Sequence, residues 1–404
     1  MKASFSPQEN FAVGAAKLSI SLLCCSGSLE GGGSERQLWQ LASHLSRPQF
    51  QPSVYLLYRK GVFVEQLPSD TPLYDFWSQN DARSFRLPGS IHTAQVQHIE
   101  TVIRETKTQV VYDRTFHMTL VTAPACKRAG VPRVSVIVSP PSEDFVRSDE
   151  RFAWLKKKRL RAAYSAADCL TLAVSSAVAD DAARFYNIDR DQIVVVPSPI
   201  DIESVGRKSV ESSGTTGGLQ PSTFCVVGRL SQEKGQLLAL NALAKLLQTE
   251  NDARLKLVGD GPDREKLIEH ARRLQISDRV EFAGFQANPY PTIASATALL
   301  IPSDYEGLPN VALEAMSLRC PVIATRCGGA VEELLGDGQR GQLVDLGDSD
   351  ALASAMARVL QEGVDCEQID AAESWVHEHH SLPGWISRME SVFEKTHSRQ
   401  WGGE

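Results

Sequence analysis

The sequence lacks several features by which common classes of protein can be identified. None of its eight cysteines belongs to a Cys-x-x-Cys pair, so a structural zinc site is not expected and the scattered thiols suit a reducing cytoplasm. No Gly-Lys-Ser/Thr phosphate loop is present, which argues against a P-loop enzyme. The longest apolar runs, KLSISLLCC among them, are too short to span a bilayer.

An overall excess of basic residues is also missing, because the formal net charge is −7. This argues against a nucleic-acid-binding protein. The charge is unevenly distributed: residues 1–200 hold 23 Lys and Arg against 19 Asp and Glu, whereas the remaining residues hold 19 against 30. A basic N-terminal half on an acidic chain leaves room for an anionic partner on that half.

Short apolar runs alternate with amphipathic segments along most of the chain. The predicted strands of the first half are LSISLLCC, SVYLLY, QVVYD, RVSVIV, CLTLAVS and IVVVPS, and those of the second half are TFCVVG, ARLKLVGD, RVEFAG, ATALLIPS and CPVIAT. Helical patterns such as SERQLWQLASHL and GQLLALNALAKLL lie between them. This alternation predicts parallel sheets that helices cover on both faces.

At 404 residues the chain is long enough for two domains. The stretch VGRKSVESSGTTGGLQPS is rich in Gly and Ser and interrupts the alternation, so a linker is predicted there. We therefore expect a flexible leader at residues 1–16, a first domain at 17–200, a linker at 201–222 and a second domain at 223–380. The final segment, 381–404, has an apolar helical face that we expect to pack back onto the first domain: Trp385, Ile386, Met389, Val392 and Phe393.

The stretch SDYEGLPNVALEAMSLRCPVIAT places two acidic residues, Glu306 and Glu314, on either side of a predicted helix start. The apolar run before it is typical of a buried strand, and Pro309 suits the first helical position. Free backbone amides at a helix start attract anions, above all phosphate. The arrangement indicates a site for a ligand that has both a phosphate and several hydroxyl groups.

Two cations, Arg229 and Lys234, flank the loop in VVGRLSQEKG, which leads into a helix near Gly235. A guanidinium and an ammonium beside a helix N-terminus can hold a diphosphate. An ordinary strand-to-helix loop with solvated charges fits the same residues, and the loop alone does not decide between the two interpretations.

Glycines mark two further strand-to-helix turns. In SLEGGGSERQ, the residues Gly31, Gly32 and Gly33 allow backbone amides to approach a ligand closely, whereas a tight turn alone needs one glycine. In LVGDGPDREKL the turn resembles half of a dinucleotide-binding fingerprint, but Arg264 stands in place of the third glycine. A dehydrogenase is therefore disfavoured.

Histidines occur at two places that invite a functional interpretation. His117 lies a few residues beyond a predicted strand in VVYDRTFHMTL, although a lone histidine is more often structural. His377, His379 and His380 end a predicted helix, where histidines suit the helix dipole. No second ligand pattern accompanies this cluster, so a metal site is not expected.

The segment WLKKKRLRAAY is predicted to be a strongly basic helix. It is either a solvated face or a contact with an anionic membrane surface. The membrane contact would be made by Lys156, Lys157, Lys158, Arg159 and Arg161.

Taken in order, these motifs resemble the retaining glycosyltransferases of family 4, which have the GT-B fold. The resemblance is strongest from Phe224 to about Leu346, through GRLSQEKG, LVGDGP, VEFAGF, SDYEGLPNVALEAMSLRCPVIATRCGGAVEEL and GQLVDLGD. The first half matches more loosely, through the glycine loop, VVYDRTFHMTL and LAVSSAVADDAARFY. The resemblance implies an α/β fold of two Rossmann-like, doubly wound domains that face each other across a cleft.

The resemblance also implies roles for residues of the motifs. Glu306 would face the transferred sugar, and Glu314 would hydrogen-bond the ribose hydroxyls of the donor. Arg229 and Lys234 would neutralise the leaving nucleoside diphosphate, and His117 would orient the donor sugar. The expected catalytic residues are thus His117, Arg229, Lys234 and Glu306. The expected donor-binding residues are Gly32, Gly33, Gly228, Gly259, Phe285, Gly307, Leu308, Pro309, Asn310, Val311 and Glu314.

The implied reaction moves a hexose or N-acetylhexosamine, with retention, from a nucleotide diphosphate sugar to a glycan, lipid-linked or small-molecule acceptor. Cleavage of the anomeric C–O bond develops negative charge on the diphosphate. Two fixed cations and a helix N-terminus can stabilise that charge in place of a divalent metal, so neither a cofactor nor a metal is expected. The expected location is the cytoplasm, with peripheral contact to the inner face of the membrane.

Other functions fit parts of the pattern. A nucleotide-sugar epimerase shares the architecture but lacks the Arg-to-Lys loop in this form. A phosphorylase would carry a pyridoxal-binding lysine, for which no convincing site is present. A non-catalytic nucleotide-sugar-binding protein is a third alternative, against which the intact set of polar site residues argues.

The sequence departs from the family pattern at two places. VPSPID has Ser198 and Pro199 where the family has Pro-Asn-Gly-x-Asp, which puts in doubt the hinge or acceptor contacts of this stretch. Glu30 places an acidic side chain directly before the glycines, close to the expected diphosphate. It is expected either to point outward or to bias the choice of acceptor.

Overall fold

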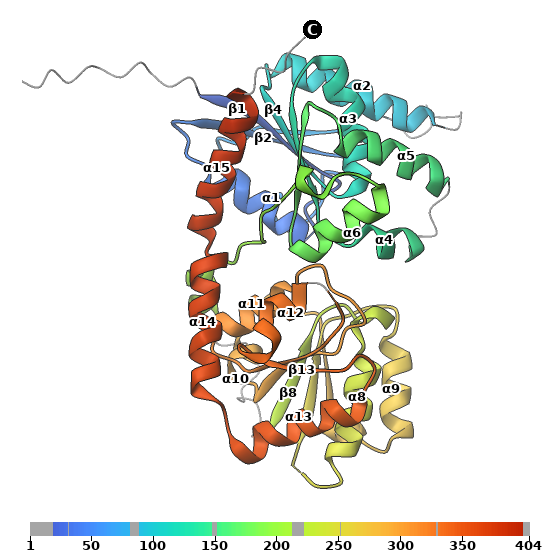
Figure 1. The fold of residues 1–404 in the computed structure, drawn as a ribbon, viewed down its shortest axis with the longest axis vertical. Coiled ribbons are helices and arrows are strands. Elements are labelled where there is room, and N and C mark those ends of the chain that lie inside the picture. The colour runs from blue at the N-terminus through green and yellow to red at the C-terminus, as the bar shows by residue number, and fades with distance from the viewer. Residues whose placement is uncertain are drawn as a thin grey trace, which may run out of the picture.

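The chain folds into two α/β domains, each built on a parallel sheet with helices on both faces (Figure 1). This computed structural model describes residues 19–30, 32–80, 89–147, 152–211, 222–250, 252–328 and 330–398. The predicted flexible leader lies outside the described residues. The predicted fold class, two doubly wound domains, is confirmed.

The first domain has a seven-stranded sheet of order β3-β2-β1-β4-β5-β6-β7. Its strands are β1 Ile20–Ser26, β2 Phe50–Leu56, β3 Leu73–Asp75, β4 Val110–Arg114, β5 Arg133–Ile137, β6 Cys169–Ala173 and β7 Ile193–Val195. Its helices are α1 Gly33–His44, α2 Ser90–Glu105, α3 Phe116–Ala129, α4 Pro141–Arg147, α5 Ala153–Tyr164 and α6 Ser176–Tyr186. The central strand β1 is buried along its length apart from Ser21, as its continuous apolar run requires in a sheet covered on both faces.

The second domain has a six-stranded sheet of order β10-β9-β8-β11-β12-β13. Its strands are β8 Thr223–Val227, β9 Arg254–Val258, β10 Val280–Gly284, β11 Ala298–Ile301, β12 Val322–Thr325 and β13 Gln342–Val344. Its helices are α7 Ile202–Ser209, α8 Gln236–Leu246, α9 Arg264–Arg273, α10 Tyr290–Ser295, α11 Asn310–Ser317, α12 Ala330–Leu335, α13 Ser349–Glu362 and α14 Cys366–His380.

The strand order fixes where a ligand can bind. In each sheet the order reverses direction, between β1 and β4 in the first domain and between β8 and β11 in the second. Ligands of doubly wound folds bind outside the carboxyl ends of the strands at this point. The chain leaving those four strand ends contains the glycine loop, His117, the loop from Arg229 to Lys234, and Glu306.

Part of the predicted linker at residues 201–222 is helical. Its first part is helix α7, whose N-terminus is capped by Asp201, which accepts a hydrogen bond from the Ser204 amide at 2.9 Å. Val205 is buried in a cluster with second-domain residues. Ile202 packs against the same cluster, so apolar contacts and an N-cap accompany the helix in this polar stretch, and residues 212–221 lie outside the described part of the chain.

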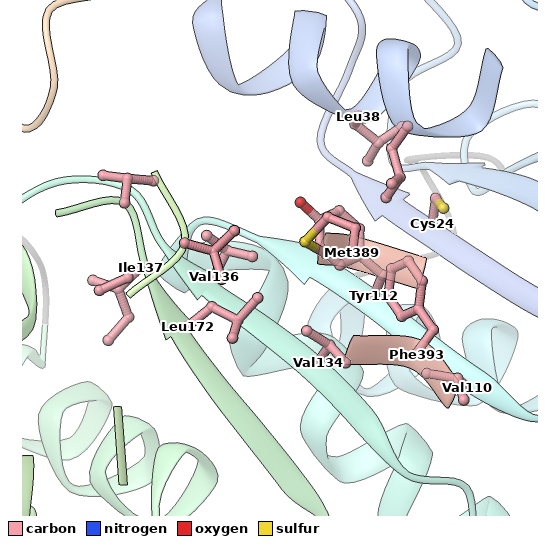
Figure 2. Packing of buried hydrophobic residues seen from close by; sticks show 14 of the residues in the cluster. Cys24, Leu38, Val110, Tyr112, Val134, Val136, Ile137, Leu172, Met389 and Phe393 are labelled. Carbon is pink, nitrogen blue, oxygen red and sulfur yellow. The ribbon is translucent and has the colours of Figure 1, made fainter. Parts of the chain in front are cut away.

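The last helix, α15 (Leu382–Ser398), returns to the first domain after α14 has passed the second (Figure 1). Its apolar face is buried beside β4 and β5, where Phe393 lies edge-to-face on Tyr112 with ring centroids 5.8 Å apart. Figure 2 shows Met389 and Phe393 among the strand residues Tyr112, Val134 and Val110. Full burial of such side chains contributes roughly 1.5–3 kcal/mol each, which holds the helix on this domain.

Candidate active site

A cavity of about 340 Å³ lies between the two domains, at the carboxyl ends of their strands. The first domain contributes Gly33 and Arg114 to its lining, and the second contributes Lys234, Glu306 and Asn310. Six of the predicted site residues line this one space: Gly33, Lys234, Glu306, Gly307, Leu308 and Asn310. Residues that are far apart in the sequence therefore share a single site.

Lys234 and Glu306 form an ion pair inside this cavity. Lys234 Nζ lies 2.7 Å from Glu306 Oε1, and the Ser303 hydroxyl donates to the same oxygen at 2.8 Å. Gly235, which follows the lysine, has φ +65°, and a Cβ there would lie 1.8 Å from the carbonyl oxygen of Pro302. Glycine is thus needed where the lysine loop crosses the strand end that leads to Glu306. The site thus places a cation that can bind an anion beside a carboxylate that can accept hydrogen bonds from hydroxyl groups.

Glu314 is held by a second cation, which comes from the other domain. Its Oε1 accepts a hydrogen bond from Arg36 Nη1 at 2.8 Å and another from the Tyr290 hydroxyl at 3.2 Å. Burial raises the pKa of the Glu314 carboxyl, while the Arg36 guanidinium opposes that rise. The expected ribose-binding carboxylate is therefore engaged across the domain boundary.

The glycine loop reaches the same boundary. A Cβ on Gly33 would lie 2.5 Å from Asn310 Nδ2, so a larger residue at this position would displace the Asn310 side chain where α1 approaches α11. The side-chain oxygen of Asn310 is buried and accepts no hydrogen bond within the described residues. The Gly32 amide donates to Glu35 Oε2 at 2.5 Å, and Gly31 lies outside the described residues.

Glu30, the acidic residue before the glycines, faces Lys60. Its Oε1 lies 2.8 Å from Lys60 Nζ, and the Ser28 hydroxyl donates to its Oε2 at 3.3 Å. The ion pair with Lys60 lowers the pKa of the Glu30 carboxyl. The side chain is exposed and does not line the cavity between the domains.

His117 lies in an adjoining space. It is the second residue of α3, at an exposed position, and lines a cavity of about 350 Å³ together with Phe116 and Ile137. This second cavity shares three wall residues with the first: Val138, Ser139 and Asp144. The predicted histidine is therefore next to the Lys234–Glu306 cavity rather than inside it.

The remaining predicted residues lie around the cavity or away from it. Arg229 is exposed, and its side chain makes no hydrogen bond or ion pair within the part of the chain described. Gly228 and Gly259 lie back to back at the ends of β8 and β9, where a Cβ on Gly259 would be 1.9 Å from the Gly228 carbonyl oxygen. Phe285 is 79% exposed. Pro309 precedes α11 as its N-cap, and Val311 lies in the first turn.

Sequence reasoning missed three residues that the structure brings to this region: Arg36, Tyr290 and Arg114. Arg114 ends β4 and is buried, donating from Nε to the Ser34 hydroxyl at 3.0 Å and from Nη1 to the Tyr112 hydroxyl at 2.8 Å. A charged residue that ends a buried strand at the ligand-binding edge is a signal that could have identified it. No local pattern links Arg36 or Tyr290 to Glu314.

The histidines of α14 have different surroundings. His380 is buried, with Nδ1 2.7 Å from the carbonyl oxygen of Ser198, whereas His377 is exposed. Across the described residues, no group of three or more His, Cys, Asp or Glu side chains is arranged to hold a metal ion.

Two family models match the chain. The one described as Glycosyltransferase Family 4 matches residues 31–204, and the one described as Glycosyl transferases group 1 matches residues 221–362. Together they cover most of both domains.

Named relatives share the sequence over part of their length. Lipopolysaccharide 1,6-galactosyltransferase of Salmonella typhimurium is 31% identical over 235 residues, which is 56% of this chain and 60% of that protein. The N-acetylgalactosamine-N,N'-diacetylbacillosaminyl-diphospho-undecaprenol 4-alpha-N-acetylgalactosaminyltransferase of Campylobacter jejuni is 27% identical over 199 residues, 49% of this chain and 52% of that protein. The match thus spans between half and two thirds of these relatives.

The fold is shared with solved structures. Anabaena HepE, crystallised in complex with UDP, superposes with a TM-score of 0.77 at 22% identity, over 94% of this chain and all of that chain. At this identity the likeness concerns the fold, which is that of two facing Rossmann-like domains.

Proposed function

The chain belongs to the family 4 glycosyltransferases of the GT-B fold, and from this premise we propose that it transfers a sugar from a nucleoside diphosphate sugar, with retention. One observation carries the proposal: a cavity between the domains holds Lys234, Glu306 and the N-terminus of α11 together. These groups offer a cation, a hydroxyl acceptor and free backbone amides. A sugar diphosphate has the matching phosphate oxygens and hydroxyls.

The chemistry follows from the charge that develops on the leaving group. As the anomeric C–O bond breaks, negative charge grows on the diphosphate and the sugar gains oxocarbenium character. Lys234 and Arg229 would stabilise that diphosphate, while Glu306 would hold the sugar hydroxyls. Attack by the acceptor on the same face, with a phosphate oxygen taking its proton, would retain the anomeric configuration.

For the donor we propose a uridine nucleotide sugar as the first to be tested, because a protein of the same fold was crystallised with UDP. Glu314 would exchange its hydrogen bond from Arg36 for hydrogen bonds from the ribose hydroxyls. Hexosyl and N-acetylhexosaminyl donors are both included, since the relatives carry both kinds of name.

For the acceptor we propose a glycan or a lipid-linked glycan. The relatives are named for lipopolysaccharide and for a diphospho-undecaprenol substrate. The cavity at His117 adjoins the proposed donor cavity and has aromatic and apolar walls, Phe116 and Ile137 among them. An acceptor bound there would place its hydroxyl beside the transferred sugar.

A membrane surface is the partner proposed for helix α5. Its basic residues are Lys156, Lys157, Lys158, Arg159 and Arg161, and the aromatic residues Phe152 and Trp154 at its start are 71% and 70% exposed. Cations beside exposed aromatic rings suit an anionic bilayer interface. Among the described residues, the helices include none with the length and apolarity needed to cross a membrane.

The donor assignment is tested by Lys234→Ala. The change removes the cation beside the diphosphate, and kcat is expected to fall about 10²-fold or more. Thermal shift against UDP, GDP and ADP identifies the nucleotide first, since a ligand that binds only the folded state raises its stability. Calorimetric titration and turnover of that nucleotide sugar then compare the variant with wild type.

The matched control is Lys245→Ala. Lys245 pairs with Asp350 at 2.7 Å on the surface of the second domain, outside the cavity, so its loss is expected to leave turnover unchanged. Wild-type turnover in Lys234→Ala would refute the donor site. Nucleotide-sugar binding without transfer to any acceptor would instead favour the non-catalytic alternative.

Catalysis is proposed to need no divalent metal, because Lys234 and Arg229 can supply the positive charge at the diphosphate. Turnover in 5–10 mM EDTA, on the order of that in Mg²⁺, is the expected result, with at most about a twofold difference. Loss of activity in EDTA that Mg²⁺ or Mn²⁺ restores would contradict this part of the proposal.

A further inference from the structure

A separate cavity of about 780 Å³ lies in the first domain, walled by helices α2, α3 and α5. None of its lining residues lines the cavity between the domains or the one that contains His117. The residues of α3 that line it extend towards the C-terminal end of the helix, whereas His117 is at the N-terminal end. The proposed donor chemistry therefore makes no use of this space.

The walls of the cavity are mainly apolar. Val96, Leu120, Ala123, Pro124 and Ala163 line it, and the small alanines leave the space that larger side chains would fill. Thr119 is a polar residue of the wall, but its hydroxyl already donates a hydrogen bond to Asp113 Oδ1 at 2.6 Å. An apolar chain is the kind of ligand that such walls favour.

Basic side chains accompany these apolar walls. His92, Lys127, Arg128 and Arg159 line the cavity, with Asp168 as the acidic residue of the lining. Lys127 and Arg159 are exposed and make no side-chain hydrogen bond or ion pair within the described ranges. Burial and the charges of Arg159 and Arg128 lower the pKa of His92, in keeping with a positive potential at this place.

The fifth basic residue, Arg133, is of a different kind. It is fully buried and donates to the Ser135 hydroxyl and to the carbonyl oxygen of Ala163. Ser135 in turn donates to Asp113 Oδ2 at 2.8 Å, so the charge of Arg133 is balanced inside the domain. The charge that remains for a ligand is that of the exposed cations, Lys127 and Arg159 first.

We propose that this cavity binds one molecule of an anionic phospholipid, with an acyl chain against the apolar walls and the phosphate beside Lys127 and Arg159. The cavity has exposed cations beside apolar walls, and a phospholipid likewise has a charged headgroup joined to apolar chains. A nucleotide fits less well, since the walls offer few free hydrogen-bonding groups for a base. The exposed aromatic residues Phe152 and Trp154 lie at the start of α5, the helix whose C-terminal half lines the cavity, and would bring this helix to a bilayer surface.

The inference goes beyond glycosyl transfer and does not depend on it. It also differs from electrostatic adsorption, in which cations on a surface attract many headgroups without taking up a chain. The two are separated by a soluble probe that presents no surface. Dihexanoyl phosphatidylglycerol, used below its micelle concentration with the full chain, is such a probe.

Calorimetric titration and native mass spectrometry are expected to show one dihexanoyl phosphatidylglycerol bound per chain. Ala162→Trp fills the cavity from α5 at an exposed position, without changing any charge, and is expected to weaken this binding about tenfold or more. The matched control is Ala371→Trp, at an exposed position of α14 in the other domain, which is expected to bind as wild type does. Thermal shift with UDP is expected to be the same in all three proteins.

A second variant removes charge and keeps the cavity. Lys127→Gln with Arg159→Gln is expected to reduce binding of dihexanoyl phosphatidylglycerol about tenfold, and to leave the weaker binding of dihexanoyl phosphatidylcholine unchanged. Equal binding by wild type and Ala162→Trp would overturn the proposal, as would full competition by inorganic phosphate. A failure of UDP binding in wild type would count against the proposed donor and not against the lipid cavity.

Discussion

At the scale of single residues, the carboxylate of Glu314 is held by a cation from the opposite domain. Arg36 Nη1 donates to it at 2.8 Å, and 278 residues separate the two in sequence. Burial alone disfavours the charged form of a carboxyl, and the guanidinium restores part of what burial removes. Arg36 thus supplies a positive charge that favours the ionised form of the Glu314 carboxyl.

The pH dependence of stability tests this account of Glu314. Burial raises its pKa above the ordinary value of 4.5 in the folded protein, so the folded state binds the proton more tightly than the unfolded state does. The contribution of this carboxyl to the free energy of unfolding is therefore fully present below pH 4.5 and is lost as the pH rises through the raised pKa. Glu314→Gln cannot ionise, so its stability relative to wild type is expected to increase with pH across that window.

Thermal midpoints measured from pH 4 to pH 8 give the comparison. The control is Glu378→Gln, which removes an exposed carboxyl from α14 and is expected to show no such trend. A constant difference between wild type and Glu314→Gln over the whole range would mean that Arg36 compensates burial completely.

Residue types in motifs were predictable, whereas their partners were not. Lys234 and Glu306 were predicted from loops that follow strands, and the structure brings them to 2.7 Å from each other. Arg36 and Tyr290 escaped prediction because their contact with Glu314 is set by domain packing and not by spacing along one helix. His117 was predicted to orient the donor sugar, and this stays a prediction: the residue lines the cavity that adjoins the one holding Lys234 and Glu306.

At the scale of elements, the junction of α14 and α15 joins the two domains. The Ile200 amide donates to the carbonyl oxygen of His380 at 2.8 Å, and the Leu382 amide donates to that of Ile200 at 3.0 Å. The two segments that connect the domains are thereby bonded to each other. The His380 ring is buried against Trp375, with Nδ1 2.7 Å from the Ser198 carbonyl oxygen.

Acid is expected to weaken this junction. Burial lowers the pKa of His380 from 6.5 to about 4, with smaller contributions from His379 and Arg388. The folded state thus binds the proton less tightly than the unfolded state, so stability present above pH 6.5 is lost as the pH falls towards 4. A shift of this size corresponds to about 3 kcal/mol.

The variant His380→Gln tests the origin of this loss. Gln can still donate a hydrogen bond to Ser198 but does not titrate, so its unfolding free energy is expected to fall less between pH 7 and pH 4.5 than that of wild type. His377→Gln, at an exposed position of the same helix, is the control and is expected to follow wild type. Identical slopes for both variants would assign the acid sensitivity to other groups.

Elements with a clear apolar pattern were predictable from the sequence. The runs predicted as strands contain β5 to β12 and overlap β1, β2 and β4, and α15 begins at Leu382 as its apolar face suggests. The three-residue strands β3 and β13 carry too short a pattern to be recognised, and α7 is stabilised by a cap and one buried valine within a polar stretch. Local pattern thus predicts elements whose burial extends over several turns or strand positions.

At the scale of the whole molecule, the two domains meet through backbone as well as side chains. A Cβ on Gly307 would lie 2.7 Å from the carbonyl oxygen of Val138 in the other domain, and the Ser175 hydroxyl donates to the Gly307 carbonyl oxygen at 3.2 Å. Leu308 packs against apolar clusters of both domains. Family resemblance predicted the cleft. The distance between its walls is set by these contacts between the domains, which the sequence pattern of either domain alone does not reveal.

This close approach makes Gly307 a sensitive point for domain closure. Gly307→Ala places a methyl group against the backbone of Val138 and Ser139 in the first domain. Backbone atoms cannot move aside as the end of a flexible side chain can. The domains are expected to separate slightly, which misplaces Lys234 and Glu306 relative to the first domain. Because catalysis depends on positioning within an ångström, kcat is expected to fall about 10²-fold while each domain remains folded.

Turnover and small-angle X-ray scattering together decide this last prediction. Gly206→Ala is the matched control, because Gly206 lies within α7 with nothing near its Cβ position, and alanine favours a helix by about 1 kcal/mol. The Gly307 variant is expected to show a larger radius of gyration than both wild type and the control. Unchanged turnover together with an unchanged radius would mean that the domains close without the Gly307–Val138 contact, and the cleft would then be held by Arg36, Glu314 and Leu308.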